Sequence, residues 1–158
     1  MKSPTDFPDF EAFVIKAEPR LRRALTAGFG AAEGRDATRD ALSWGWENWA
    51  RVKRMRNPVG YLYRVGATSA VRGRPSAREH AEPIVVDDAV GFEPSLIPAL
   101  QSLSEQQRTA VVLVHGYGYT FREAADVLGV SLSTLRNHVK RALLRLRSEL
   151  EVEHEYVD

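Results

Sequence analysis

Apolar residues recur every three or four positions along the first part of the chain. The positions with this spacing are Phe10, Phe13, Val14, Ala17, Leu21, Leu25 and Phe29. Such a spacing places the apolar side chains on one face of an α-helix. Pro19 falls inside the pattern, and we expect a kink or a fresh helix start there because proline lacks a backbone N–H. Gly28, Gly30 and Gly34 are expected to end the segment.

The pattern predicts a second helix from about Asp36 to Trp49 and a third helix that begins at Pro58. One face of the second helix carries Thr38, Leu42, Trp46 and Trp49, and another face carries Asp36, Arg39, Asp40, Ser43 and Glu47. Tryptophans at positions 44, 46 and 49 are expected to fill a small core, with an aromatic cage for a cation as the alternative. The third helix is expected to weaken at the Gly-Arg-Pro sequence of residues 73–75.

Two sequences in the second half of the chain have the form of a helix capping box, Ser104–Gln107 and Thr120–Glu123. In such a box the side chain of the first residue accepts a hydrogen bond from the backbone N–H of the fourth residue. The side chain of the fourth residue accepts one from the backbone N–H of the first. The apolar run at 110–114 could also form a strand, but the first box favours a helix. The second box predicts a short helix that ends at Gly129, and Ser131 opens the last helix.

The last predicted helix has an apolar face and a polar, basic face. The apolar face carries Leu135, Val139, Ala142, Leu143, Leu146 and Leu150, and the polar face carries Ser133, Thr134, Arg136, Asn137, Lys140 and Arg141. Small Ala125, turn-forming Gly129 and apolar Val130 precede it, in the order that a helix-turn-helix requires. We therefore expect the N-terminal part of this helix to enter a DNA major groove. A helical hairpin with a solvated basic face is the alternative.

The charge is unevenly distributed along the 158 residues. The net charge is only +1, yet residues 1–74 carry 14 basic and 8 acidic side chains, and residues 96–150 carry 7 and 4. Residues 75–95 hold three prolines, one basic side chain and five acidic ones, which is typical of a linker. Residues 151–158 form an acidic tail. We expect an all-α protein with two small helical domains, 7–74 and 96–150, joined by a flexible acidic linker.

The composition excludes several classes of protein. The chain has no cysteine, which excludes a disulfide scaffold, a thiol nucleophile and a cysteine zinc site and fits a cytoplasmic location. No apolar run approaches the roughly 20 residues that cross a bilayer, and the N-terminus does not have the pattern of a signal peptide. The four histidines lie far apart, and no nucleophile or phosphate-binding motif occurs. We therefore expect no enzymatic activity, no metal and no other cofactor.

Three stretches of the chain resemble a known protein family. Residues 36–49 are DATRDALSWGWENW and residues 57–72 are NPVGYLYRVGATSAVR. Both resemble the second domain of bacterial sigma factors of the extracytoplasmic-function type, within the sigma-70 family. Residues 103–150, LSEQQRTAVVLVHGYGYTFREAADVLGVSLSTLRNHVKRALLRLRSEL, resemble the fourth domain of the same factors. Together the three stretches cover nearly everything outside the linker and the tail.

The resemblance implies that the protein binds core RNA polymerase and directs it to promoter DNA. The clamp helices of the largest polymerase subunit would contact Asp36, Arg39, Asp40, Ser43 and Trp46. The melted −10 strand would contact Lys53, Arg54, Arg56, Asn57, Tyr61, Arg64, Thr68 and Arg72. The −35 duplex would contact Thr120, Arg122, Ser133, Thr134, Arg136, Asn137, His138, Lys140 and Arg141. In this family an anti-sigma factor often holds the sigma factor, so such a partner is a candidate here.

The chain departs from the family pattern at a few positions. Arg39 stands where glutamine is frequent, and Thr68 stands where asparagine is usual. The third helix lacks the basic run that usually follows, because Gly73 and Pro75 cut it short. The residues alone also leave open a stand-alone DNA-binding regulator that uses only residues 96–150. That alternative gives no role to the polar face of residues 36–49.

Overall fold

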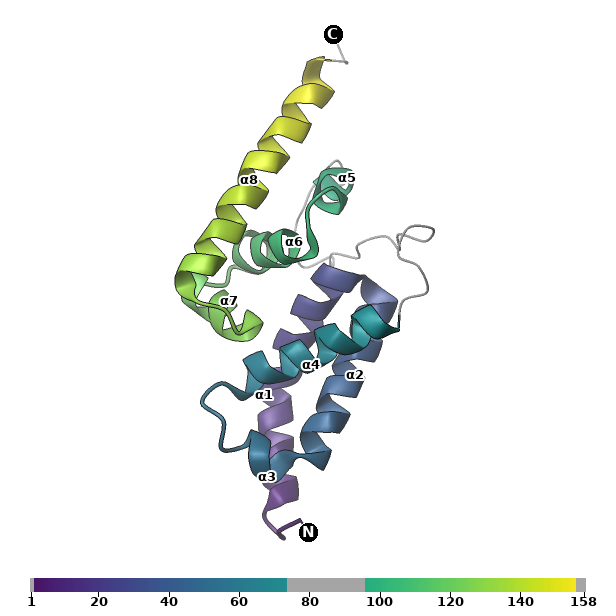
Figure 1. Ribbon diagram of the computed structural model, residues 1–158, viewed down its shortest axis with the longest axis vertical. Coiled ribbons are helices and arrows are strands. Elements are labelled where there is room, and N and C mark those ends of the chain that lie inside the picture. Colours follow the sequence, from purple (N-terminus) through teal and green to yellow (C-terminus); the bar gives the residue numbers. More distant parts are fainter. Residues whose placement is uncertain (1, 74–95, 156–158) are drawn as a thin grey trace.

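Figure 1 shows the computed structural model of the chain, which describes residues 2–73 and 96–155. Within these ranges the regular elements are all helices. The N-terminal half contains α1 (Asp6–Phe29), α2 (Ala31–Glu47), α3 (Trp49–Val52) and α4 (Pro58–Arg72). The C-terminal half contains α5 (Leu96–Gln101), α6 (Glu105–Val111), the π-helical turn η2 (Val112–Gly116), α7 (Phe121–Leu128) and α8 (Leu132–Glu155). The predicted all-α class is confirmed, and the predicted linker at 75–95 lies outside the described residues.

The first helix is less interrupted than its sequence indicates. α1 continues through Pro19, so the fresh start expected there is wrong. Ala17 and Leu21, on either side of the proline, are 1% and 0% exposed, and their burial in the core offsets the loss of one backbone hydrogen bond. The break falls instead at Gly30, whose φ of 94° is readily adopted only by glycine.

The second helix begins at Ala31, earlier than the expected Asp36. Gly34, expected to end the preceding segment, lies inside α2 and is buried. A Cβ atom at Gly34 would lie 2.5 Å from Cα of Thr26. Glycine is therefore needed here because it allows α1 and α2 to approach closely.

The aromatic residues of the N-terminal half form one cluster. The ring centroids of Phe10 and Phe13 each lie 5.2 Å from that of Trp49, which is buried. Trp44 and Trp46 are half-buried and pack against the edge of the same core. The prediction that tryptophans fill the core is confirmed for Trp49 and holds only in part for the other two.

The predicted helix starts of the C-terminal half are present. The Ser104 hydroxyl accepts a hydrogen bond from the N–H of Gln107 at 3.2 Å, and a helix follows rather than a strand. α8 runs beyond the expected end at Leu150. Leu143, expected on the apolar face, is 43% exposed. Leu143 follows the buried Leu135 by eight residues, which places the two side chains about 80° apart around the helix axis.

The two halves pack against each other and share buried clusters of apolar side chains. Leu25 and Leu62 belong to the same cluster of buried side chains as Leu113, Leu128 and Leu135. α1 contacts α6, and α4 contacts α7, as Figure 1 shows. The sequence leaves open how the halves are arranged, and the structure shows them closed on each other.

Candidate nucleic-acid interface

Local signals build the helix-turn-helix of α7 and α8. The Thr120 hydroxyl accepts a hydrogen bond from the N–H of Glu123 at 3.0 Å, and the Glu123 carboxylate accepts one from the N–H of Thr120 at 3.3 Å. Hydrogen bonding of the Glu123 carboxylate to the side chain of Thr120, and then to the backbone N–H of Thr120, holds the pKa of Glu123 below its usual range. Ala125 is buried, and Gly129 has a left-handed φ of 64°. The predicted capping box and the predicted turn are both confirmed.

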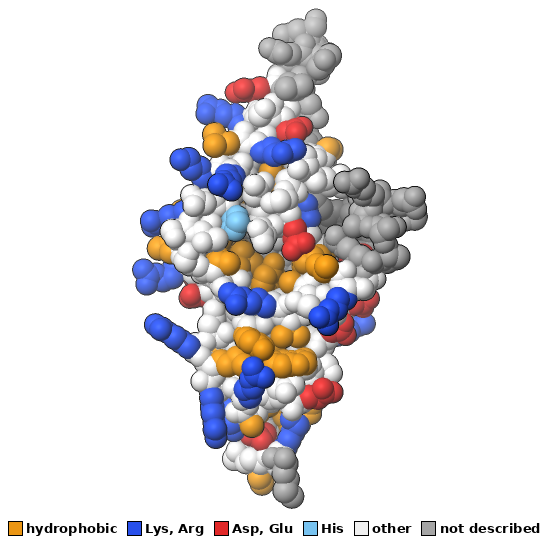
Figure 2. All heavy atoms as spheres, viewed as in Figure 1, with side chains coloured by type: hydrophobic (Ala, Val, Ile, Leu, Met, Phe, Trp, Pro, Cys, Tyr) orange, Lys and Arg blue, Asp and Glu red, His pale blue; other side chains and the backbone are white. Residues whose placement is uncertain are grey.

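The outward face of α7 and α8 is polar and basic. Its exposed side chains include Thr120, Arg122, Ser133, Arg136, Asn137, Lys140 and Arg141. Figure 2 shows Lys and Arg side chains gathered along the side of the molecule that these two helices form. Guanidinium and amide groups on such a helix face can reach base edges in a major groove.

Thr134 and His138, also predicted to contact the −35 duplex, lie differently. Thr134 is half-buried, with its hydroxyl oxygen 2.8 Å from that of Ser131 at the start of α8. His138 is half-buried in a groove of about 360 Å³, which Arg64 of α4 also lines. Burial there, and then the charge of Arg141, lower the pKa of His138. In the closed arrangement His138 therefore faces the other half of the molecule.

A cleft of about 780 Å³ lies between α2 and α4. It is lined by four residues predicted to contact the −10 strand, Tyr61, Arg64, Thr68 and Arg72. Trp44 joins them, with its ring centroid 5.5 Å from that of Tyr61. Aromatic rings beside cationic groups can stack with unpaired bases. The sequence analysis expects Trp44 in the core. Its spacing of four residues from Asp40, however, indicates that the two side chains lie on the same face of α2, which lines the cleft.

The polar face of α2 adjoins this cleft. Asp40 lines the cleft, and its carboxylate accepts a hydrogen bond from the hydroxyl of Ser69 on α4. Asp36, Arg39 and Ser43 are exposed on the same face. The guanidinium of Arg39 lies 3.8 Å from the carboxylate of Asp36, and an ion pair this exposed contributes little to stability. These side chains therefore form an accessible polar surface.

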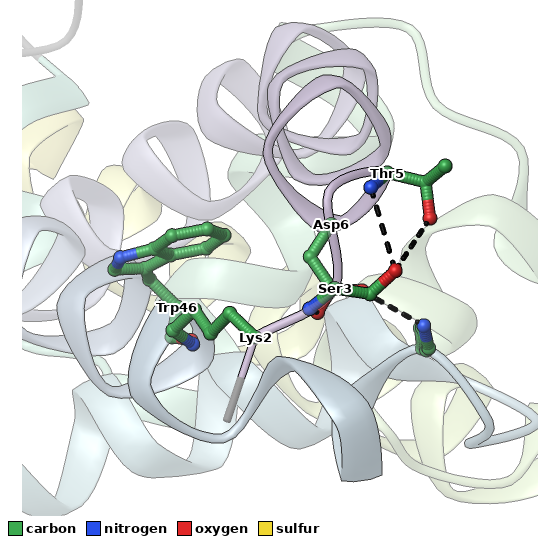
Figure 3. A network of polar contacts seen from close by, with 6 residues as sticks. Lys2, Ser3, Thr5, Asp6 and Trp46 are labelled. Carbon is green, nitrogen blue, oxygen red and sulfur yellow. Dashed lines mark hydrogen bonds and ion pairs between the residues drawn. The ribbon is translucent and has the colours of Figure 1, made fainter.

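Trp46, also predicted to contact polymerase, packs against the N-terminal segment, as Figure 3 shows. The ammonium nitrogen of Lys2 lies 4.0 Å from its ring centroid, and the Phe7 ring stands nearly perpendicular to it at 6.1 Å. A cation over an indole face contributes about 0.5–1 kcal/mol at an exposed site. Trp46 therefore belongs to the predicted polymerase face, while its ring also contacts Lys2 and Phe7 of the N-terminal segment.

The basic turn between α3 and α4 contains two kinds of cation. Arg54 and Arg56 are exposed. Lys53 forms an ion pair instead, with its Nζ 2.9 Å from Oδ1 of Asp6. The hydrogen bond from Lys53, and then one from the backbone N–H of Ser3, hold the pKa of Asp6 below its usual range. Lys53 therefore points toward α1.

Asn57 and Arg64 reach toward the C-terminal half. Asn57 caps α4 by accepting a hydrogen bond from the N–H of Gly60 at 3.0 Å, and its Nδ2 donates to the carbonyl of Asp126 at 2.7 Å. The guanidinium of Arg64 donates to the carbonyl of Gly129. Both predicted −10 contacts are thus bonded to the helix-turn-helix in the closed arrangement.

An apolar groove of about 390 Å³ adjoins the outward face of α8. It is lined by Phe121, Val139, Leu143 and Leu144 and by the cations Arg136, Lys140 and Arg147. Leu144 is 58% exposed and Phe121 is 37% exposed. These side chains form a small apolar patch that solvent can reach, bordered by three cations.

Residues 2–73 and 96–155 contain no group of three or more His, Asp or Glu side chains that could hold a metal ion. They also contain no helix long and apolar enough to cross a membrane.

The chain is similar to sequences of one protein family along most of its length. The family model described as Sigma-70, region 4 matches residues 99–148, which contain the helix-turn-helix. The RNA polymerase sigma-E factor of Streptomyces coelicolor is 29% identical over 152 residues, which cover 90% of this chain and 86% of that protein. The RNA polymerase sigma-E factor of Streptomyces antibioticus is 43% identical over 56 residues, which cover 35% of this chain and 31% of that protein.

Two solved structures have a similar fold. The sigma factor RpoE, in complex with the anti-sigma factor NepR from Bartonella quintana, matches with a TM-score of 0.62 and 25% identity over 91% of this chain and 98% of that chain. CnrH, in complex with the cytosolic domain of CnrY, matches with a TM-score of 0.56 and 22% identity over 90% and 88%. At that identity, the likeness to CnrH shows the fold alone. Both matches extend over the N-terminal and the C-terminal half.

Proposed function

Because the chain belongs to the sigma-70 family of RNA polymerase sigma factors, as a factor of the extracytoplasmic-function type, we propose that its two halves divide promoter recognition between them. As a sigma factor it directs transcription. Residues 7–74 are the proposed domain for core polymerase and the −10 element, and residues 96–150 are the proposed domain for the −35 element. The chain is proposed to act in the cytoplasm. It needs no catalytic group of its own, because RNA synthesis belongs to the polymerase.

The outward face of α8 is the observation that carries this proposal. It combines a capped helix-turn-helix with exposed Arg136, Asn137 and Arg141. Arginine can bond bidentately to guanine and asparagine to adenine in the major groove. Arg136 and Asn137 are the proposed base contacts, and Arg141 is the proposed phosphate contact, which gives affinity without reading sequence.

The cleft between α2 and α4 is the proposed site for the unpaired −10 strand. Trp44 and Tyr61 offer ring faces, and Arg64 and Arg72 offer cations for phosphates. Stacking on such rings contributes about 1–3 kcal/mol per base. The exposed cations Arg54 and Arg56 of the preceding turn are proposed to extend this surface.

The polar face of α2 is the proposed surface for the clamp helices of the largest polymerase subunit. Asp36, Arg39, Asp40 and Ser43 lie on it, beside the proposed −10 site. A stand-alone regulator would need only the helix-turn-helix. The similarity to the Streptomyces coelicolor sigma-E factor extends over 90% of this chain, which supports a shared function for both halves.

An anti-sigma factor is a further proposed partner, with the apolar groove beside α8 as its docking surface. Leu143 and Leu144 are exposed between the cations Arg136, Lys140 and Arg147, so the complementary partner surface combines apolar and acidic side chains. A two-hybrid screen of a genomic library with the full chain as bait tests this assignment. Clones lost with Leu144→Asp and kept with Arg145→Ala support the groove, whereas clones insensitive to Leu144→Asp exclude it.

Run-off transcription tests the function as a whole. Core RNA polymerase from the same bacterium is mixed with the full chain and genomic DNA, and the transcript starts are sequenced. The expected result is a set of starts that depend on the chain and share two upstream sequence elements. If starts with and without the chain are the same, the proposed function is wrong.

A further inference from the structure

The cleft between α2 and α4 contains an acid among its cations. Asp40 lines this cleft together with Arg64 and Arg72. The two arginines can bind the phosphates of a nucleic-acid strand, whereas a carboxylate repels phosphates. Phosphate binding therefore does not account for the presence of Asp40 in the cleft, and a different kind of contact has to be considered.

The carboxylate of Asp40 is held by a neighbour on the opposite helix. Its Oδ2 accepts a hydrogen bond from the hydroxyl of Ser69, which lines the cleft from α4. An ionised carboxylate only accepts hydrogen bonds, and its two oxygens together offer about four sites for them. The bond from Ser69 therefore fixes the orientation of the carboxylate and leaves Asp40 able to accept from a donor inside the cleft.

Two aromatic rings lie about one helical turn from this acid. Asp40 and Trp44 are four residues apart on α2, which places their Cβ atoms about 5–6 Å apart on one face of the helix. The ring centroid of Trp44 lies 5.5 Å from that of Tyr61 on α4. α2 and α4 pack side by side, as Figure 1 shows. The cleft between them thus has an aromatic end and an acidic end, separated by about the size of a nucleobase.

We propose that Asp40 is a specificity-determining residue, which selects one base of the unpaired −10 strand by accepting a hydrogen bond from its amino group. This inference rests on the proposed function, which assigns the unpaired strand to this cleft. The selected base stacks on Trp44 and Tyr61, and its Watson–Crick edge faces Asp40. Only an unpaired base offers that edge, because pairing occupies it in a duplex.

The chemistry of the bases determines which of them the carboxylate accepts. Cytosine, adenine and guanine each carry an amino group, whose N–H bonds can donate to a carboxylate. Thymine has no amino group, and the carbonyl oxygens on both sides of its ring N–H repel a carboxylate. A buried or bound polar group that is left without its partner lowers the affinity for the wrong ligand. Asp40 therefore disfavours thymine at the position that enters the cleft.

Binding of single-stranded −10 oligonucleotides to holoenzyme tests the inference. The strand of a mapped promoter is made in pairs that carry deoxycytidine or deoxyuridine at one position, and this position is moved along the −10 element. The two bases have the same ring, but uracil has a carbonyl oxygen where cytosine has its amino group. At one position, holoenzyme with the unsubstituted chain should bind the deoxycytidine strand about tenfold more tightly than the deoxyuridine strand.

Three variants assign this preference to Asp40. Asp40→Asn should largely abolish it, because an amide both donates and accepts and therefore suits either base. Ser69→Ala removes the group that orients the carboxylate and should reduce the preference in part. Asp36→Asn is the matched control and should leave it unchanged, because Asp36 is an exposed acid of the same helix that does not line the cleft. Both strands are compared on the same holoenzyme, so a weaker affinity of a variant for polymerase cancels.

The outcomes separate this inference from the proposed function. The absence of a deoxycytidine preference at every −10 position overturns the role of Asp40, and so does a preference that Asp40→Asn retains or that Asp36→Asn loses equally. Failure of the unsubstituted holoenzyme to bind any −10 strand instead contradicts the proposed function of the cleft. Should Asp40→Asn form no holoenzyme, Ser69→Ala decides: a reduced preference supports the inference, and an unchanged preference overturns it.

Discussion

Nζ of Lys53 lies 2.9 Å from Oδ1 of Asp6, although 47 residues separate the two in the chain. Asp6 is only 4% exposed at the start of α1. The ion pair joins that helix end to the basic turn before α4, and Figure 3 shows the N-terminal network to which Asp6 belongs. Lys53 therefore has a structural role that its place in a basic cluster does not indicate.

Asp6→Asn should make stability less dependent on acid pH. The pKa of Asp6 is lowered in the folded protein, so its contribution is complete above the unfolded value of about 3.9 and is lost as pH falls through the lower folded value. We expect lower stability at pH 7 and a flatter loss below about pH 4. Urea unfolding at several pH values measures both, and Asp9→Asn, an exposed acid of the same turn, is the control. Identical curves for the two variants would refute the role of the ion pair.

Gly129→Ala should destabilise the protein. The left-handed φ of 64° costs an L-residue about 1–2 kcal/mol, and the new Cβ would press on the carbonyl of Gly60 at 3.2 Å. Gly73→Ala is the matched control, because Gly73 follows a helix with an ordinary φ of −78°. It should be neutral or gain about 0.4–1 kcal/mol. Denaturant midpoints distinguish the two, and equal effects would contradict the assigned turn.

Arg136→Ala should relax sequence choice at one position of the −35 element. If Arg136 pairs with a base, the loss of discrimination there is about 1–3 kcal/mol. Competition between promoter variants in run-off transcription measures it. Arg145→Ala, another exposed arginine of α8, should leave sequence choice unchanged. An unaltered preference in Arg136→Ala counts against base contact.

Arg141→Ala should weaken binding to all promoter sequences by a similar factor. A lysine or arginine that neutralises one phosphate releases counterions, so its loss reduces the slope of log affinity against log salt by about 1. Titration of holoenzyme with duplex DNA at several salt concentrations measures this slope. The phosphate role is rejected if the slope of the variant equals that of the unsubstituted chain.

Tyr61→Ala should weaken binding of the unpaired −10 strand. The ring lies beside Trp44 in the cleft between α2 and α4, and the loss of one stacked base costs about 1–3 kcal/mol. Binding of a single-stranded −10 oligonucleotide to holoenzyme is the measurement. Tyr61→Phe keeps the ring and should bind like the unsubstituted chain. A similar loss in both variants would point to the hydroxyl instead of stacking.

Local sequence signals predicted most of the helix-turn-helix. The Thr120–Glu123 capping box and the turn at Gly129 depend on residues within a few positions of one another. Helix starts and stops are determined by such short-range hydrogen bonds and φ preferences. Pro19 shows the limit of this reasoning, because the burial of α1 outweighed the local signal to break.

The candidate site was predicted less completely. The sequence identified Tyr61, Arg64, Thr68 and Arg72, which the structure brings together in one cleft. It missed Trp44, because helical periodicity does not separate a ring in the core from a ring at the edge of the core. It also grouped His138 with the outward residues of α8, although the side chain faces α4.

The sequence by itself determined the all-α class, the capped helix starts at Ser104 and Thr120 and the helix-turn-helix, because each depends on residues close together in the chain. It did not determine where α2 begins. The tertiary structure decided which of the predicted contacts are available. Lys53 is paired with Asp6, and Asn57 and Arg64 are bonded to the end of α7. These pairings join residues 47 to 69 positions apart, and only the packing of helices against one another brings such groups within hydrogen-bonding distance.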